Sequence, residues 1–196
     1  LGAYLGTSPH HIFLRENITS AFNDFLFALP PLGEGEIVAT GWEYGGITGL
    51  ARHWANSCGL AFRTVPLPFR ADWDASGLCR ELVGSLTPRT RILLISHVAT
   101  CNGAIFPIKE IAMAARDRGI ITLIDGAHAV GAIPTRLDEL DADFYGGNFH
   151  KWFLGPEGTG FGWVHPRWRD RLDWKFGGWA TDLPPAFYQG FGDRDP

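Results

Sequence analysis

The stretch that decides the fold is residues 121–162, ITLIDGAHAVGAIPTRLDELDADFYGGNFHKWFLGPEGTGFG. It opens with an apolar strand that ends in an acid, and a loop follows. A second short strand, residues 143–145, precedes a turn rich in glycine and proline and a third apolar segment. The polar side chains of chemical interest come where the apolar segments end: Asp125, His128, Asn148, His150 and Lys151.

Lys151 is a candidate nucleophile. Where desolvation and neighbouring cations keep a lysine amine neutral, it can form a Schiff base with an aldehyde. Asp125, at the end of a neighbouring strand, is placed to hold a pyridinium nitrogen protonated, which makes pyridoxal 5'-phosphate (PLP) an electron sink. Alone, each residue has an ordinary interpretation, as a surface lysine or a helix-capping aspartate. The ordered combination with His128, Asn148 and His150 favours the cofactor site.

Three motifs carry a family resemblance: DGAHAVG (125–131), ADFYGGNFHKW (142–152) and GPEGTGF (155–161). They resemble the large domain of class V aminotransferases, fold-type I PLP enzymes that include cysteine desulfurases, isopenicillin N epimerase and related C–S lyases. The resemblance covers nearly the whole chain and is strongest to the isopenicillin N epimerase-like branch. It implies PLP as the cofactor and Lys151 as its point of attachment.

Strands and helices alternate along the chain, which predicts an α/β fold with a mostly parallel sheet. Apolar spacing and turn residues predict helices at 18–29, 47–57, 74–86 and 108–118, and strands at 12–14, 36–40, 60–65, 91–96 and 120–124. Right-handed crossovers bring the carboxyl ends of parallel strands to one rim, where ligands bind. The resemblance implies a three-layer sandwich with about seven strands.

The start of the helix at 18–29 is a candidate phosphate site, because free N–H groups and the helix dipole attract anions. Asn17 is the expected cap, and ordinary capping is the alternative interpretation. The resemblance implies that Thr19 contacts the phosphate, with Ser20 adding a hydroxyl. It also implies phosphate contacts from His150 and from Asn148, where the family usually has serine.

The resemblance places three more residues around the cofactor ring. Tyr44, in GWEYGG, matches the aromatic or histidine that stacks on the ring, with Trp42 as the competing candidate. Thr100, in SHVATCNG, matches the residue that hydrogen-bonds the phenolic oxygen. His128 is expected near the ring or its O3' atom. His97 is predicted to be structural, and Cys101 is more readily a small packed residue than a nucleophile.

Composition excludes several classes of protein. Hydrophobic residues make up 45% of the 196 residues and charged residues 19%, which is typical of a globular chain. The net charge of -4 and the lack of a basic block argue against nucleic acid, and no apolar run is long enough for a membrane span. The scattered Cys58, Cys79 and Cys101 favour a reducing, cytoplasmic location, and no zinc-type spacing predicts a metal site.

The chain is predicted to be a fragment, because members of this family are about twice as long. Residues 1–165 are expected to be an N-terminally truncated PLP-binding large domain, and 166–196 the incomplete start of a linker and C-terminal domain. The tail GDRDP resembles a family motif whose threonine reaches the phosphate of a neighbouring subunit. Asp193 stands at that position, which puts the contact in doubt unless Arg194 compensates.

The sequence therefore predicts a PLP-dependent enzyme that acts at Cα or Cβ of an amino acid, isopenicillin N epimerase-like or C–S lyase-like. A cysteine desulfurase or aminotransferase of the same family is an alternative, although Thr100 stands where desulfurases have asparagine. A non-catalytic binding or assembly protein of this fold is another. A nucleotide phosphate loop fails, because Lys151 precedes the glycines. The resemblance implies a homodimer. Aromatic residues of the tail, such as Trp179 and Phe187, are candidates for that contact, and packing on the missing C-terminal domain is the alternative interpretation.

Overall fold

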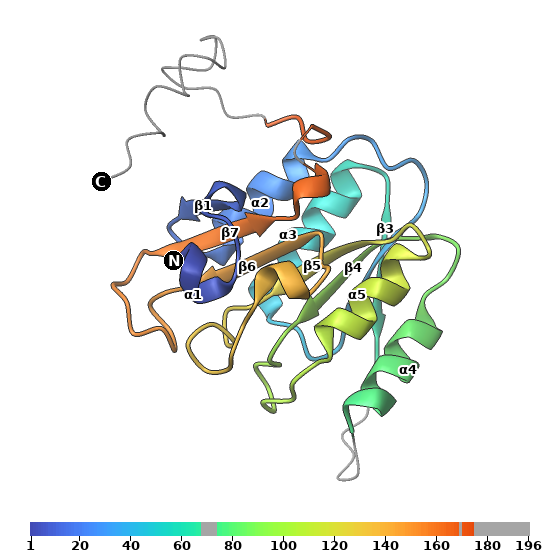
Figure 1. Cartoon of the computed structure of the whole chain (residues 1–196). Coiled ribbons are helices and arrows are strands. Elements are labelled where there is room, and N and C mark those ends of the chain that lie inside the picture. The colour runs from blue at the N-terminus through green and yellow to red at the C-terminus, as the bar shows by residue number, and fades with distance from the viewer. Residues whose placement is uncertain (68–73, 169, 175–196) are drawn as a thin grey trace.

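The computed structural model describes residues 1–67, 74–168 and 170–174, and its centre is a mixed β-sheet (Figure 1). Within these residues the sheet has seven strands in the order β1-β7-β6-β5-β4-β2-β3. The strands are β1 (Ile12–Arg15), β2 (Glu36–Thr40), β3 (Ala61–Val65), β4 (Thr90–Ser96), β5 (Ile121–Asp125), β6 (Phe144–Asn148) and β7 (Gly160–Val164). Strands β2 to β6 run parallel, whereas β7 is antiparallel to both β6 and β1. The predicted mostly parallel sheet of about seven strands is confirmed.

Helices cover both faces of the sheet, which gives the predicted three layers (Figure 1). The helices are α1 (Gly2–Leu5), α2 (Ile18–Ala28), α3 (Gly45–Ser57), α4 (Ala75–Ser85) and α5 (Ile108–Arg116), with short 3-10 turns at Pro9–His11, Leu137–Glu139 and Pro166–Trp168. One buried cluster joins the sheet to α1, α4 and α5, and the other joins it to α2 and α3. Because both faces are covered, β2, β5 and β6 are buried along their whole length.

The helix starts follow the capping chemistry of the sequence. The Asn17 side chain accepts a hydrogen bond from the Ser20 N–H at 2.9 Å, and Asp74 does the same for the Gly77 N–H at 2.6 Å. Asn17 is thus confirmed as the cap of α2. Other helix ends differ from prediction by about two residues, since α3 begins at Gly45 and α5 ends at Arg116.

The predicted strand at 143–145 is too short, and this is a correction. Strand β6 extends through Asn148 and includes Gly146 and Gly147, which look like turn residues in the sequence. They are needed for close packing. A Cβ on Gly146 would lie 2.6 Å from the Ile18 side chain, and one on Gly147 would lie 2.6 Å from the Phe161 ring. Pairing with β5 and β7 on both sides offsets the weak strand preference of glycine.

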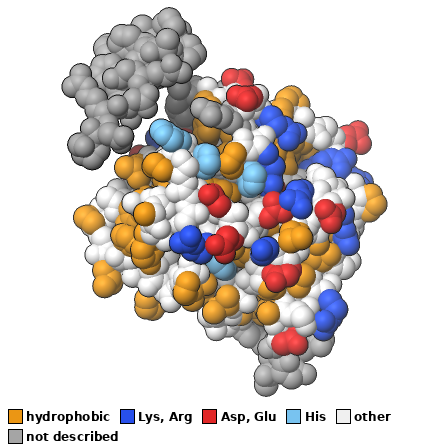
Figure 2. All heavy atoms as spheres, in the orientation of Figure 1, with side chains coloured by type: hydrophobic (Ala, Val, Ile, Leu, Met, Phe, Trp, Pro, Cys, Tyr) orange, Lys and Arg blue, Asp and Glu red, His pale blue; other side chains and the backbone are white. Residues whose placement is uncertain are grey.

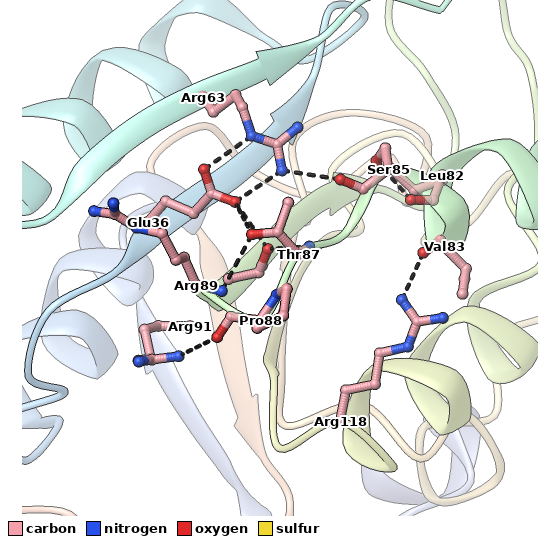
Figure 3. Close-up of polar contacts among 11 residues, drawn as sticks. Glu36, Arg63, Leu82, Val83, Ser85, Thr87, Pro88, Arg89, Arg91 and Arg118 are labelled. Carbon is pink, nitrogen blue, oxygen red and sulfur yellow. Dashed lines mark hydrogen bonds and ion pairs between the residues drawn. The ribbon is translucent and has the colours of Figure 1, made fainter.

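A partly buried polar network around Glu36, the first residue of β2, links β2 to β3 and β4 (Figure 3). The Glu36 carboxylate accepts two hydrogen bonds from the Arg63 guanidinium, at 2.9 and 2.8 Å. It also accepts hydroxyl hydrogen bonds from Thr87 at 2.8 Å and Thr90 at 3.0 Å. These donors hold the pKa of Glu36 at about 2, with the hydrogen bonds from Arg63 as the largest cause. The ionised carboxylate therefore links β2 to β3 and β4.

Among the residues that the structure describes, no helix combines the length and apolar character needed to cross a membrane. The predicted boundary between a large domain (1–165) and a following segment (166–196) remains a prediction, because residues 175–196 lie outside the described part of the chain.

Candidate active site

A cavity of about 350 Å³ lies at the rim where the parallel strands end. Its lining residues come from the segments that follow β1, β2, β4, β5 and β6 and from the turn before β7: Glu16, Asn17, Ile18, Thr19, Tyr44, Thr100, Asp125, Ala127, Asn148, His150, Lys151, Glu157 and Gly158. Seven of the nine predicted site residues are in this set. The exceptions are His128, which contacts Lys151, and Ser20, which lies in the first turn of α2. Two larger hollows, of about 460 and 670 Å³, contain none of the nine.

Lys151 contacts the loop that follows β5. Its Nζ atom lies 3.0 Å from Nε2 of His128 and 6.0 Å from the centre of the Tyr44 ring. Burial lowers the pKa of His128, and the positive charge of Lys151 lowers it further. A neutral imidazole therefore stands against the amine. Trp152 approaches the other side of the imidazole, with its indole nitrogen 3.1 Å from Nδ1.

Asp125 is a buried acid, only 5% exposed, at the last position of β5. Its Oδ1 atom accepts a hydrogen bond from the Ala127 N–H at 2.9 Å. Burial raises its pKa, and the Ala127 hydrogen bond and the charge of Lys151 oppose that rise only in part. A carboxylate that is desolvated in this way is stabilised by a cationic N–H donor within the cavity.

The start of α2 presents donors to the same cavity. Asn148 Oδ1 accepts from the Ile18 N–H at 2.9 Å, and Asn17 accepts from the Ser20 N–H. The N–H of Thr19, which lies between them, bonds to no other described residue, and Thr19 lines the cavity. His150 also lines it, and its Nδ1 atom is buried without a partner in the described part of the chain. Free donors at a helix start suit an anion.

Glu43 was not predicted as a site residue. Its two carboxylate oxygens accept hydrogen bonds from the hydroxyl groups of Thr40 and Ser96, each at 2.5 Å. Burial raises its pKa to about 7, and the nearby Asp125 also contributes to the rise. The available signal was an acid inside GWEYGG, one position before the candidate stacking residue Tyr44. The side chain of an acid at this position is expected to point into the protein only where hydroxyl groups at the strand ends donate hydrogen bonds to it.

Three other residues considered from the sequence do not line the cavity: Trp42, His97 and Cys101. Trp42 is buried and its indole N–H donates to the Leu67 carbonyl at 3.0 Å, so it packs in the core. Tyr44 is 54% exposed and lines the cavity. His97 is buried, with Nδ1 2.9 Å from the Tyr145 hydroxyl, and burial lowers its pKa to about 4. Cys101 is exposed and is not among the lining residues.

Four tail residues with predicted contacts lie outside the described residues: Trp179, Phe187, Asp193 and Arg194. Within the described ranges, no group of three or more histidine, cysteine, aspartate or glutamate side chains is arranged to hold a metal ion.

The chain is similar to known proteins over most of its length. Residues 4–193 match the family model for class V aminotransferases. The chain is 34% identical to the isopenicillin N epimerase of Streptomyces clavuligerus, over 98% of this chain and 49% of that protein. It is 27% identical to the putative L-cysteine desulfhydrase 2 of Oryza sativa subsp. japonica, over 84% of this chain and 37% of that protein.

A solved structure of the cystine C–S lyase C-DES, a mutant with glycine covalently linked to its PLP cofactor, superposes with a TM-score of 0.83. The two chains are 26% identical, and the match covers 91% of this chain and 47% of that one. The chain thus spans about half the length of the curated relatives it matches. Because the family model matches residues 4–193, nearly the whole chain, this chain belongs to the class V aminotransferase family.

Proposed function

We propose that this chain is the PLP-binding part of an enzyme that removes the Cα proton of an amino acid. The observation that carries the proposal is the Lys151 amine, 3.0 Å from a neutral His128, in a cavity that also contains the buried Asp125. A lysine in this setting can act both as the attachment point of an aldehyde cofactor and as the base at Cα.

The residues present fit PLP. Asp125 offers a buried carboxylate to the ring N–H, and the pairing would stabilise its ionised form. Thr19 at the start of α2 and the unpartnered Nδ1 of His150 offer donors to the phosphate. Tyr44 offers an aromatic face for stacking, and Thr100 offers a hydroxyl. When bound, PLP withdraws electrons from the substrate Cα.

The proton that leaves Cα is received by Lys151. His128 orients the amine through its Nε2 contact. The side-chain oxygen of Asn148 accepts a hydrogen bond from the Ile18 N–H. The side-chain NH₂ group of Asn148 is then available as a further donor to the phosphate. Ser20 stays a predicted contact, through a hydroxyl that does not line the cavity in the present arrangement.

We favour an epimerase-like or C–S lyase-like outcome. Two similarities support this choice: the chain is 34% identical to an isopenicillin N epimerase and 26% identical to the solved cystine C–S lyase C-DES. In an epimerase the proton returns to Cα, whereas in a lyase the β-substituent leaves. No arginine is among the residues that line the cavity in the described part of the chain, so we expect the partner of the substrate carboxylate to come from elsewhere in the protein.

The test is covalent loading. Purified protein is mixed with PLP, reduced with borohydride and digested, and the labelled peptide is identified by mass spectrometry. Label on Lys151 supports the proposal, and the Lys151→Ala variant should carry none there. Label spread over surface lysines, unchanged in Lys151→Ala, would overturn it. Cα proton exchange of candidate amino acids in D₂O then tests the deprotonation that both reactions share. Release of the sulfur-bearing fragment identifies lyase-like chemistry, and inversion at Cα without release identifies epimerase-like chemistry.

We also propose a homodimer. Figure 2 shows hydrophobic side chains gathered on the side of the molecule where Figure 1 places α1. Four exposed residues form an apolar patch beside the candidate site: Tyr4, Trp152, Phe153 and Leu154. The rings of Tyr4 and Phe153 are in contact, with centres 5.2 Å apart. Exposed apolar groups of this kind favour a protein partner. The three cysteines are free, which supports the proposed cytoplasmic location.

A further inference from the structure

The residue that follows the candidate nucleophile has an unexplained contact. Trp152 is 56% exposed, yet its indole Nε1 atom lies 3.1 Å from Nδ1 of His128. On the other side of the same imidazole, Nε2 lies 3.0 Å from Nζ of Lys151. The three side chains therefore form one line of hydrogen bonds, which runs from the protein surface to the amine.

The proton positions along this line follow from the chemistry of its members. An indole N–H can only donate, so Nδ1 of His128 must accept and carries no proton. The single proton of the neutral imidazole is then on Nε2, which donates to Lys151. A protonated ammonium has no lone pair and cannot accept this hydrogen bond. The arrangement is therefore complete only when the Lys151 amine is unprotonated.

We propose that Trp152 is a positioning residue: its indole N–H fixes the Nε2–H tautomer of His128, and His128 in turn orients the Lys151 amine and favours its unprotonated form over the ammonium. The importance of this for catalysis rests on the proposed function of Lys151. The hydrogen-bond line itself is a property of the chain without cofactor.

The surroundings of the line contain opposing charges. Asp125 lies near Lys151 and favours an ammonium, but burial raises the pKa of Asp125 and so weakens its negative charge. The exposed carboxylates of Glu16 and Glu157 line the same cavity and also favour an ammonium. Desolvation lowers the pKa of His128, which keeps it neutral and able to donate through one nitrogen only. The Tyr44 ring and His150 complete the group around the amine.

Backbone packing holds the two loops in register. A Cβ on Gly131 would lie 2.5 Å from backbone atoms of Trp152 and Phe153, so only glycine allows the loops to come this close. Gly131 also has a φ of 89°, which favours glycine. The Gly155 N–H donates to the Phe149 carbonyl at 2.6 Å and closes the turn behind Lys151. The indole is thus placed by its backbone, while most of its ring stays outside the core.

The first measurement is the tautomer of His128 in the wild-type protein without PLP, by NMR with ¹⁵N-labelled histidine. The His128→Gln variant assigns the signal. The proposal expects a proton on Nε2 at neutral pH. A proton on Nδ1 would overturn it without the need for any tryptophan variant.

The second measurement is the pH dependence of Lys151 acylation by a small acyl donor such as acetic anhydride, which releases acetate, followed by mass spectrometry. In Trp152→Phe, which removes the N–H and keeps an aromatic ring, we expect the reaction midpoint to rise by about 1 pH unit. The rate at neutral pH should fall about tenfold. Leu154→Asn is the control, since Leu154 is 89% exposed in the same loop and has a φ of 59°, which asparagine tolerates.

The outcomes separate this inference from the proposed function. An unchanged midpoint in Trp152→Phe, or an equal shift in Leu154→Asn, would overturn the positioning role. If Trp152→Phe alters only self-association, its role is in the apolar patch and the inference is wrong. If the wild-type tautomer and midpoint are as expected but PLP does not attach to Lys151, the hydrogen-bond line stands and the proposed function fails.

Discussion

At the scale of single residues, burial desolvates two acids: Asp125, which lines the cavity, and Glu43, which precedes the lining residue Tyr44. Asp125 and Glu43 lie within electrostatic reach of each other, and each has a raised pKa because of burial. Such groups reduce folding stability unless a ligand or hydrogen bond compensates, which is common where residues serve function.

Asp125→Asn should make the cofactor-free protein more stable by about 1 kcal/mol, because the amide keeps the acceptor for the Ala127 N–H and carries no charge to desolvate. The same change should weaken PLP binding at least tenfold, because the ring N–H loses its anionic partner. Urea unfolding and a PLP titration measure the two effects. A variant that is less stable and binds PLP normally would show that Asp125 has only a structural role.

Glu43 should make stability fall as pH rises. An unfolded glutamate titrates near 4.5, whereas folded Glu43 titrates near 7, so the folded chain binds more protons between these values. The contribution is present below about pH 4.5 and is lost through about pH 7, by up to about 3 kcal/mol. Glu43→Gln should therefore gain stability relative to wild type at pH 8 but not at pH 4.5. Equal differences at both pH values would contradict the raised pKa.

At the scale of elements, β6 and β7 depend on glycine for their packing. Gly146 pairs with Gly162 across the two strands, and a Cβ on Gly162 would lie 2.2 Å from the Phe13 ring of β1. This close approach brings β1, and the start of α2 behind it, next to Asn148 and Lys151. The glycines thus serve the geometry of the site from within the sheet.

Gly162→Ala should lower the free energy of unfolding by about 1–3 kcal/mol, since the added methyl group forces Phe13 to move. Gly49→Ala is the matched control. Gly49 lies inside α3 with open space around its Cβ position, so alanine should stabilise the helix by about 0.5–1 kcal/mol. Chemical unfolding of both variants tests the contrast, and a neutral Gly162→Ala would mean that the ring moves freely.

At the amino ends of the strands, Glu36 has the opposite pH dependence to Glu43. Its pKa is lowered to about 2, so its contribution is present above about pH 4.5 and is lost as pH falls through about 2. Glu36→Gln should cost about 2 kcal/mol at pH 7, because the Arg63 guanidinium loses its charged partner. The loss should shrink toward pH 2. A constant loss across this range would show that the network acts through shape alone.

At the scale of the whole molecule, PLP binding and folding should be coupled. Residues after β1, β2, β4, β5 and β6 meet at one cavity, so the unfolded chain has no such site. PLP at 100 times its Kd should therefore stabilise the protein by about 2.7 kcal/mol. Thermal melts with and without PLP test this, with Lys151→Ala expected to show a smaller shift. An equal shift in both would indicate binding away from Lys151.

The sequence was sufficient to predict the parallel sheet, because unbroken apolar strands and amphipathic helices can be recognised from the spacing of apolar residues alone. It was also sufficient to predict nine candidate site residues, and seven of these nine line one cavity. It failed at Gly146 and Gly147, because local preference cannot reveal the Ile18 and Phe161 side chains that need the space. It also passed over Glu43, whose role depends on hydroxyls from two other strands. Contacts between remote segments decide both cases.

The pairing of β1 with β7 joins Ile12 to Trp163, segments about 150 residues apart. Among the described strands, β1 pairs only with β7, which is synthesised after Lys151. Until β7 is made, the described sheet offers β1 no partner, and an unpaired strand can pair with another chain. A nascent chain that stalls between Lys151 and β7 would therefore carry all nine predicted site residues but remain prone to aggregation. Chaperones that bind exposed strands would be expected to hold it at that stage.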